Sequence, residues 1–125
     1  IRHESPLING DGSYSRDFTY IDNVVQANIR ALLTPNREAV NTVYNVAFGK
    51  RTTLTQLFTC LRDDFSMFDR EIAKIAPVYG PERTGDIPHS LADIGKARRL
   101  LGYAPEIDVE EGLRRTSRWY FDHLR

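Results

Sequence analysis

The chain has 125 residues, of which 41% are hydrophobic and 27% charged, a composition typical of one soluble globular domain. Its 17 basic and 17 acidic residues cancel, which argues against a surface built for nucleic acid or an anionic membrane. A single cysteine excludes an internal disulfide, and no apolar run approaches the ~20 residues that cross a bilayer. We therefore expect a cytoplasmic protein without nucleic-acid or membrane partners.

The first half of the chain alternates short extended runs with a helical pattern. Apolar residues at 6–8, followed by the glycine-rich turn at 10–12, predict a strand and a hairpin-like turn. Aromatic and threonine residues favour an extended segment over 13–20. Apolar residues then recur at helical spacing from 21 to 34, which predicts a helix with one apolar face. The β-branched and aromatic run 42–48 predicts a further strand.

The second half of the chain continues this alternation. Thr53 and Gln56 have the spacing of a capping box, and the apolar positions behind them predict a helix. An extended apolar run covers 74–80. Helical patterns follow at 92–101, closed by a glycine, and from 108 to the end. Short strands alternating with about four helices place the chain in the α/β class.

Several specific catalytic signatures are absent from this sequence. It contains no Gly-x-Gly-x-x-Gly dinucleotide fingerprint, and no tyrosine is followed four positions later by lysine. The three histidines and one cysteine lack metal-ligand spacing. Cys60 lies inside a helical pattern, which favours core packing over a role as nucleophile. We assign no catalytic residue and no metal ligand.

Two arginines stand in segments rich in turn-forming residues, Arg16 before Asp17 and Arg83 three residues before Asp86. The planar guanidinium suits phosphate oxygens, and a hydrogen bond to a charged group contributes roughly 1.5–3 kcal/mol. Two such loops would clamp a pyrophosphate, and Asp86 would accept the hydroxyls of a ribose. The competing interpretation is that each arginine pairs with its neighbouring aspartate. Spacing alone leaves both interpretations open.

Three stretches in order, residues 8–32, 43–58 and 83–113, resemble the C-terminal part of extended short-chain dehydrogenase/reductases that act on nucleotide sugars. The likeness covers nearly the whole chain except about 66–74, and it is greatest to bacterial UDP-N-acetylglucosamine 4-epimerases. The resemblance implies a Rossmann-type enzyme whose NAD-binding part is not in this sequence. We therefore expect residues 1–125 to form a single C-terminal nucleotide-sugar-binding domain that is inactive alone.

The resemblance also implies a set of ligand-binding positions. The backbone around Leu7 and Asn9 would meet the uracil of a UDP-sugar. Arg16 and Arg83 would bind the diphosphate from two sides, with Asp86 on the ribose hydroxyls.

The size of the residue at position 90 bears on which sugar the protein accepts. Similar epimerases restricted to non-acetylated sugars carry a bulky tyrosine four residues after the ribose-binding aspartate, where this chain has Ser90. A small side chain leaves room for an N-acetyl group, whereas a large one would clash. The absence of a bulky side chain at position 90 therefore favours an N-acetylated hexose. It allows the larger sugar to bind but does not compel that choice.

The family reaction, as the resemblance implies it, uses NAD that takes a hydride from sugar C4 and returns it to the opposite face. The expected full-length protein is a homodimeric UDP-N-acetylglucosamine/UDP-glucose 4-epimerase serving polysaccharide (O-antigen) biosynthesis, with NAD held mainly by the absent N-terminal part. The alternatives are part of a nucleotide-sugar 4,6-dehydratase or decarboxylase, and a binding module without catalysis. The 42–48 strand would normally join a sheet outside this chain, so we expect an exposed edge and self-association.

Overall fold

The computed structural model describes residues 3–123 and confirms the α/β class, with four α-helices and short strands. The elements are β1 (Leu7–Asn9), β2 (Ser15–Arg16), α1 (Ile21–Leu33), the 3₁₀ helix η1 (Arg37–Ala39), β3 (Thr52–Thr53), α2 (Leu54–Ser66), the 3₁₀ helix η2 (Arg70–Lys74), β4 (Val78–Gly80), α3 (Gly95–Leu101) and α4 (Val109–His123). No helix within residues 3–123 is long and apolar enough to cross a membrane.

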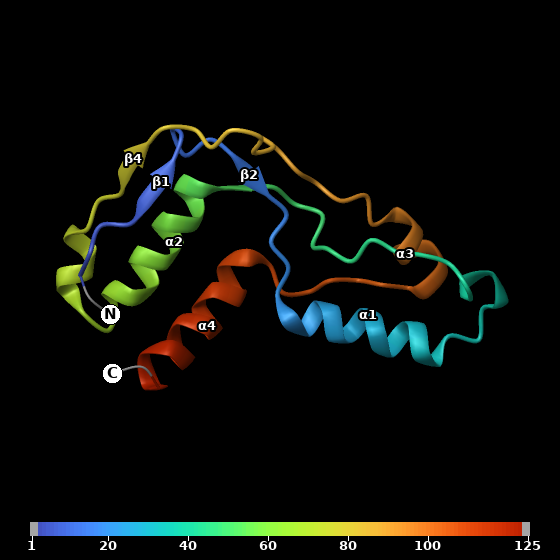
Figure 1. Cartoon of the computed structure of the whole chain (residues 1–125). Helices are drawn as coiled ribbons and strands as arrows, with labels where there is room; N and C mark the ends of the chain where they lie inside the picture. Colours follow the sequence, from blue (N-terminus) through green and yellow to red (C-terminus); the bar gives the residue numbers. More distant parts are fainter. Residues whose placement is uncertain (1–2, 124–125) are drawn as a thin grey trace.

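Helices gather at the two ends of an elongated molecule (Figure 1). Helices α2 and α4 pack together at one end, and α1 and α3 pack at the other. Extended segments connect the two ends, and the segment between β4 and α3 runs along the upper edge of the view. The β1–β4 pair therefore lies beside α2, and β2 lies nearer the extended segments that connect the two ends.

The strands form two separate pairs that join distant parts of the chain. β1 pairs in parallel with β4, and β2 pairs antiparallel with β3. The predicted hairpin-like turn after β1 is wrong, because β1 and β2 do not pair. The amide of Gly10 instead donates to the carbonyl of Gly80 at 3.0 Å, so the turn is tied to a partner 70 residues away. Local turn chemistry carries no information about such a partner.

The predicted strand at 42–48 is also wrong, since these residues form no strand. A strand needs a neighbouring strand to pair its backbone groups, and within residues 3–123 none lies alongside this run. The run is instead held by its side chains. Ala47 is buried in the core, and the Tyr44 hydroxyl donates to the Ala39 carbonyl at 2.8 Å.

The largest buried cluster is small and lies where α1, α3 and the 44–47 run meet. Its buried members are Ala27, Ala47, Ile94, Ala97 and Tyr103. The ring of Tyr103 is 1% exposed, and its hydroxyl donates to the Ala47 carbonyl at 2.8 Å. Burial therefore leaves no unpaired polar atom on this side chain.

The apolar face predicted for α1 is present but points to solvent. The buried residues of this helix are Asn23 and Ala27. Leu32 is 82% exposed and Leu33 is 71% exposed, and Ile29 is half exposed. Val43 on the neighbouring run is 83% exposed. Exposed apolar side chains gathered on one helix face are a common feature of surfaces that bind another protein.

We expect the isolated chain to self-associate through this face. Leu32→Lys should weaken the association about 10- to 100-fold, because burying a leucine side chain is worth about 1.5–3 kcal/mol. Analytical ultracentrifugation over a range of protein concentrations measures this, with Met67→Lys as a control that alters an exposed apolar residue beyond the end of α2. A chain that stays monomeric at all concentrations would contradict the expectation.

The helix ends follow the predicted caps closely. Thr53 and Gln56 form the complete capping box of α2, and Gly102 closes α3 in the left-handed conformation at φ 65°. Helix α3 begins at Gly95, three residues later than predicted, because the Asp93 carboxylate accepts the Gly95 amide at 2.7 Å and ends the extended run there. Asp108 accepts the amide of Glu111 at 3.0 Å and starts α4.

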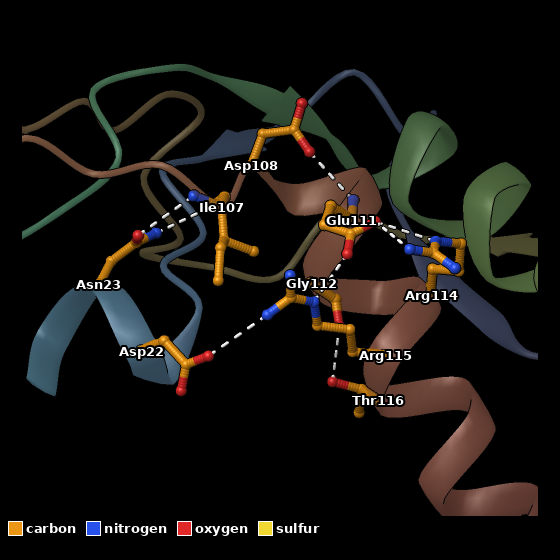
Figure 2. A network of polar contacts seen from close by, with 9 residues as sticks. All are labelled: Asp22, Asn23, Ile107, Asp108, Glu111, Gly112, Arg114, Arg115 and Thr116. Carbon is orange, nitrogen blue, oxygen red and sulfur yellow. Dashed lines mark hydrogen bonds and ion pairs between the residues drawn. The ribbon is translucent and has the colours of Figure 1, made fainter.

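The first turns of α4 join the two helical groups (Figure 2). The Glu111 carboxylate accepts hydrogen bonds from Arg115 and Arg114, which lower its pKa. Arg115 also reaches Asp22 at the start of α1, at 3.4 Å. The Glu111 carboxylate thus pairs with two arginines of its own helix, one turn further along α4.

Asn23 is the buried centre of the connection between α1 and the chain before α4 (Figure 2). Its side chain is 2% exposed. The amide nitrogen donates to the Ile107 carbonyl at 2.7 Å, and the amide oxygen accepts from the Glu106 and Ile107 amides at 3.0 and 3.2 Å. Three backbone groups of an irregular segment are therefore satisfied by one side chain.

Candidate functional site

The glycine-rich turn after β1 is pressed against the start of α2. Gly10 and Gly12 have φ angles of +78° and +83°, in the region that favours glycine. A Cβ on Gly12 would lie 2.2 Å from the Thr55 hydroxyl oxygen, so no side chain fits there. The Thr55 amide and hydroxyl both donate to the Gly12 carbonyl, at 3.1 and 3.2 Å. These contacts fix the turn from which the chain continues to Arg16.

The guanidinium of Arg16 is held in a fixed direction. Its Nη1 donates to the Ser15 carbonyl at 2.9 Å and to the Pro88 carbonyl at 3.5 Å. Its Nη2 donates to a carboxylate oxygen of Asp86 at 2.5 Å. The interpretation that Arg16 pairs with Asp17 is therefore wrong, since its ionic partner lies 70 residues away. About a third of each side chain is exposed, so a ligand can reach the pair.

Asp17 binds backbone amides of two other segments rather than Arg16. One of its oxygens accepts the amides of Phe48 and Gly49 at 3.2 and 3.1 Å. Its other oxygen accepts the Gly49 amide at 3.0 Å and the Ala92 amide at 3.4 Å. Asp17 thus links three segments through backbone hydrogen bonds. Its carboxylate is not the ionic partner of Arg16.

Arg83 and Ser90 lie on the exposed segment between β4 and α3. Arg83 starts the turn in which the Asp86 amide donates to the Arg83 carbonyl at 3.1 Å. Its guanidinium makes no ion pair with any residue of 3–123, so the competing interpretation that Arg83 pairs with Asp86 is also wrong. The Ser90 amide donates to the Ser15 carbonyl at 3.1 Å, which places position 90 beside β2.

Leu7 and Asn9 stand on β1 with their backbone groups turned outward. The Pro6 carbonyl and the Gly10 amide bond to β4. Because bonding residues alternate along a parallel strand, the N–H and C=O groups of Leu7 and Asn9 face the opposite edge. No strand of residues 3–123 covers that edge. An open backbone edge of this kind can pair with a planar base.

The structure therefore brings several of the sequence-predicted positions close together. Arg16 contacts Asp86 directly, and β2 contacts the chain at Ser90. The pairing of β1 with β4 carries Asn9 to the start of the segment that holds Arg83. The carboxyl ends of β1 and β4 meet at this place, which is where ligands bind in sheets of parallel strands.

Two further pairs at this site have no signal in the sequence. Ser15, 3% exposed, contacts His89 through its hydroxyl oxygen and Nδ1 at 3.0 Å. Tyr14 has a raised pKa, because of partial desolvation and then the hydrogen-bonded carboxylate of Glu82. Each pair joins the same two segments, 13–16 and 82–90, and each spans more than 60 positions of the chain.

Other reactive side chains do not form a second centre. The pKa of Cys60 is raised by burial and then by nearby carboxylates, which disfavours the thiolate needed for nucleophilic attack. Residues 3–123 contain no cluster of three or more histidine, cysteine, aspartate or glutamate side chains that could hold a metal ion.

A family model described as GDP-mannose 4,6 dehydratase matches residues 1–116. A putative UDP-glucose 4-epimerase of Methanocaldococcus jannaschii is 34% identical over 125 residues, which are 100% of this chain and 37% of the relative. The chain thus spans little more than a third of the length of that relative.

Solved structures give the same family. A UDP-N-acetylglucosamine 4-epimerase of Methanobrevibacter ruminantium in complex with UDP-N-acetylmuramic acid superimposes with a TM-score of 0.80 and 39% identity, over 95% of this chain and 35% of that one. A UDP-glucuronic acid 4-epimerase mutant of Bacillus cereus, in complex with a fluorinated UDP-sugar and NAD, superimposes with a TM-score of 0.79 and 28% identity, over 96% and 36%.

Proposed function

The chain belongs to the extended short-chain dehydrogenase/reductases that act on nucleotide sugars, and from this premise we propose that it is the C-terminal, nucleotide-sugar-binding part of a longer NAD-dependent 4-epimerase. Its substrate would be UDP-N-acetylglucosamine or UDP-glucose. The chain alone would bind the nucleotide and catalyse nothing.

The observation that carries the proposal is the contact between Arg16 and Asp86. A cation with a fixed direction lies 2.5 Å from a carboxylate, and both are about one third exposed. The free N–H groups of Arg16 and the exposed guanidinium of Arg83 would face a diphosphate. The second oxygen of Asp86 would accept a ribose hydroxyl. Uracil would pair with the open edge of β1 at Leu7 and Asn9.

We infer that residues 3–123 would not hold NAD by themselves. The sequence has no dinucleotide fingerprint, and the described sheets have two strands each, whereas the dinucleotide-binding fold needs a larger parallel sheet. NAD would therefore be held by other parts of the longer protein. The part that this chain plays is to bind the nucleotide and to orient the sugar.

Product analysis of the longer protein tests the proposed reaction. Incubation with UDP-N-acetylglucosamine and NAD should give a product of unchanged mass, which chromatography identifies as the 4-epimer. A product lighter by one water would make the protein a 4,6-dehydratase, the second candidate, which the description of the matching family model favours. Both reactions begin with oxidation at C4, so the mass of the product separates them.

Ser90→Tyr is expected to change the choice of sugar. The added ring would fill the space that an N-acetyl group needs, and overpacking costs about 1–3 kcal/mol. Turnover of UDP-N-acetylglucosamine should fall about 5- to 100-fold, while UDP-glucose should be affected little. Steady-state kinetics of the longer protein with both sugars measures this, with Ser90→Ala as the control. Equal losses on both sugars would contradict the placing of position 90 beside the sugar.

A further inference from the structure

The segment from 81 to 91 carries three of the proposed ligand-binding residues, yet it has little structure of its own. Every residue from 81 to 91 is exposed, and the segment contains no helix and no extended strand. Its internal hydrogen bond from the Asp86 amide to the Arg83 carbonyl forms a single turn. Its position therefore depends on the few contacts that attach it to the rest of the molecule.

Ser15 makes three of those contacts. Its amide donates to the Pro88 carbonyl at 2.9 Å, and its carbonyl accepts the Ser90 amide at 3.1 Å. Its hydroxyl oxygen lies 3.0 Å from Nδ1 of His89. The first two bonds use backbone groups that almost any residue would offer. The third needs a hydroxyl at 15 and an imidazole at 89, so it is the one that the sequence specifies.

The link from Arg16 to Asp86 holds the same segment, but it is a poor permanent anchor. Both side chains are partly exposed, and ion pairs of this kind contribute little in water. A bound nucleotide would also compete for both groups, since phosphate oxygens attract the guanidinium and ribose hydroxyls attract the carboxylate. The contacts of Ser15 take no part in the proposed ligand binding, so they can hold the segment while the nucleotide is bound.

We propose that Ser15 and His89 are positioning residues for the nucleotide site. Their side-chain contact holds the 81–91 segment against β2, so that Asp86 and Arg83 stay opposite Arg16 when the ligand loosens the ion pair. The inference rests on the proposed function, because positioning has meaning only if a nucleotide binds between these segments. Ser15 is buried and His89 is exposed, so the contact lies at the surface of the molecule.

Amide hydrogen exchange of the ligand-free chain, followed by NMR, tests the anchor without using the ligand. His89→Ala and Ser15→Ala should speed exchange of the Ser90 amide about 5- to 10-fold, as expected for loss of one net hydrogen bond. His89→Asn and Ser15→Thr keep a hydrogen-bonding group and should restore much of the protection. His123→Ala, which removes an exposed histidine of α4, should have no effect at Ser90.

Calorimetric titration with UDP tests the role in binding. His89→Ala should weaken UDP binding about 5- to 10-fold, and His89→Asn should recover part of the loss. Unchanged exchange at Ser90 would overturn the anchor, and faster exchange with unchanged UDP affinity would overturn its role in positioning. An unmodified chain that does not bind UDP would overturn the proposed function itself, and the exchange rates would then decide whether the anchor exists.

Discussion

Replacing Asn23 with alanine is expected to lower the free energy of unfolding by about 3 kcal/mol. The side chain makes three hydrogen bonds to backbone groups of Glu106 and Ile107 and is 2% exposed. Alanine would remove all three of these partly buried bonds, and each contributes about 1 kcal/mol to stability. Urea denaturation followed by circular dichroism measures the loss. For a domain whose total stability is of the order of 5–15 kcal/mol, this is a large fraction.

Asn28→Ala is the matched control for this experiment. Asn28 lies on the same helix, is exposed, and donates one hydrogen bond to the Val24 carbonyl within its own helix. Its replacement should change the free energy of unfolding by less than about 0.5 kcal/mol, because exposed substitutions away from special features have small effects. Similar losses for both variants would show that Asn23 is not the connection between α1 and the segment before α4.

Arg16→Ala is expected to weaken UDP binding about 10- to 100-fold. One charge-assisted hydrogen bond to a phosphate contributes roughly 1.5–3 kcal/mol, which corresponds to this range. Arg16→Lys should recover only part of the loss, because lysine cannot bond to the Ser15 and Pro88 carbonyls, to Asp86 and to a phosphate in one plane. Isothermal titration calorimetry at fixed salt measures all three proteins.

Arg118→Ala provides the control for the loss of one positive charge. Arg118 pairs with Asp122 on α4 and is 69% exposed. Its removal should leave UDP affinity within about twofold, since charges beyond a Debye length of roughly 10 Å are screened. If Arg118→Ala weakened UDP binding as much as Arg16→Ala, the effect would belong to net charge and not to a site at Arg16.

Features set by neighbouring residues could be predicted from the sequence. The capping box of α2 needs only Thr53 and Gln56, and the glycine that closes α3 needs only the preceding helix. The pairing of strands was not accessible in this way. The 42–48 run has the composition of a strand, but no strand of residues 3–123 lies beside it. Composition describes what a segment favours, whereas pairing depends on segments far along the chain.

In the candidate site, too, single residues could be identified from the sequence, whereas their distant partners could not. Arg16 and Asp86 were both identified as candidates, but their contact with each other spans 70 positions and replaces the neighbour pairings that spacing alone allowed. Ser15 and His89 gave no signal, because a serine beside an arginine and a histidine before a serine are ordinary in any loop. Only the fold, which lays the 81–91 segment along β2, makes them partners.

The central claim is that two arginine-bearing segments form a nucleotide half-site within this chain. Calorimetric titration of the chain with UDP, beside the Arg83→Ala variant, tests it most directly. Binding of one UDP per chain that is lost in the variant, together with an unchanged amide NMR spectrum away from 81–91, is the result we expect. A folded chain that does not bind UDP, or that binds it equally well without Arg83, would contradict the claim.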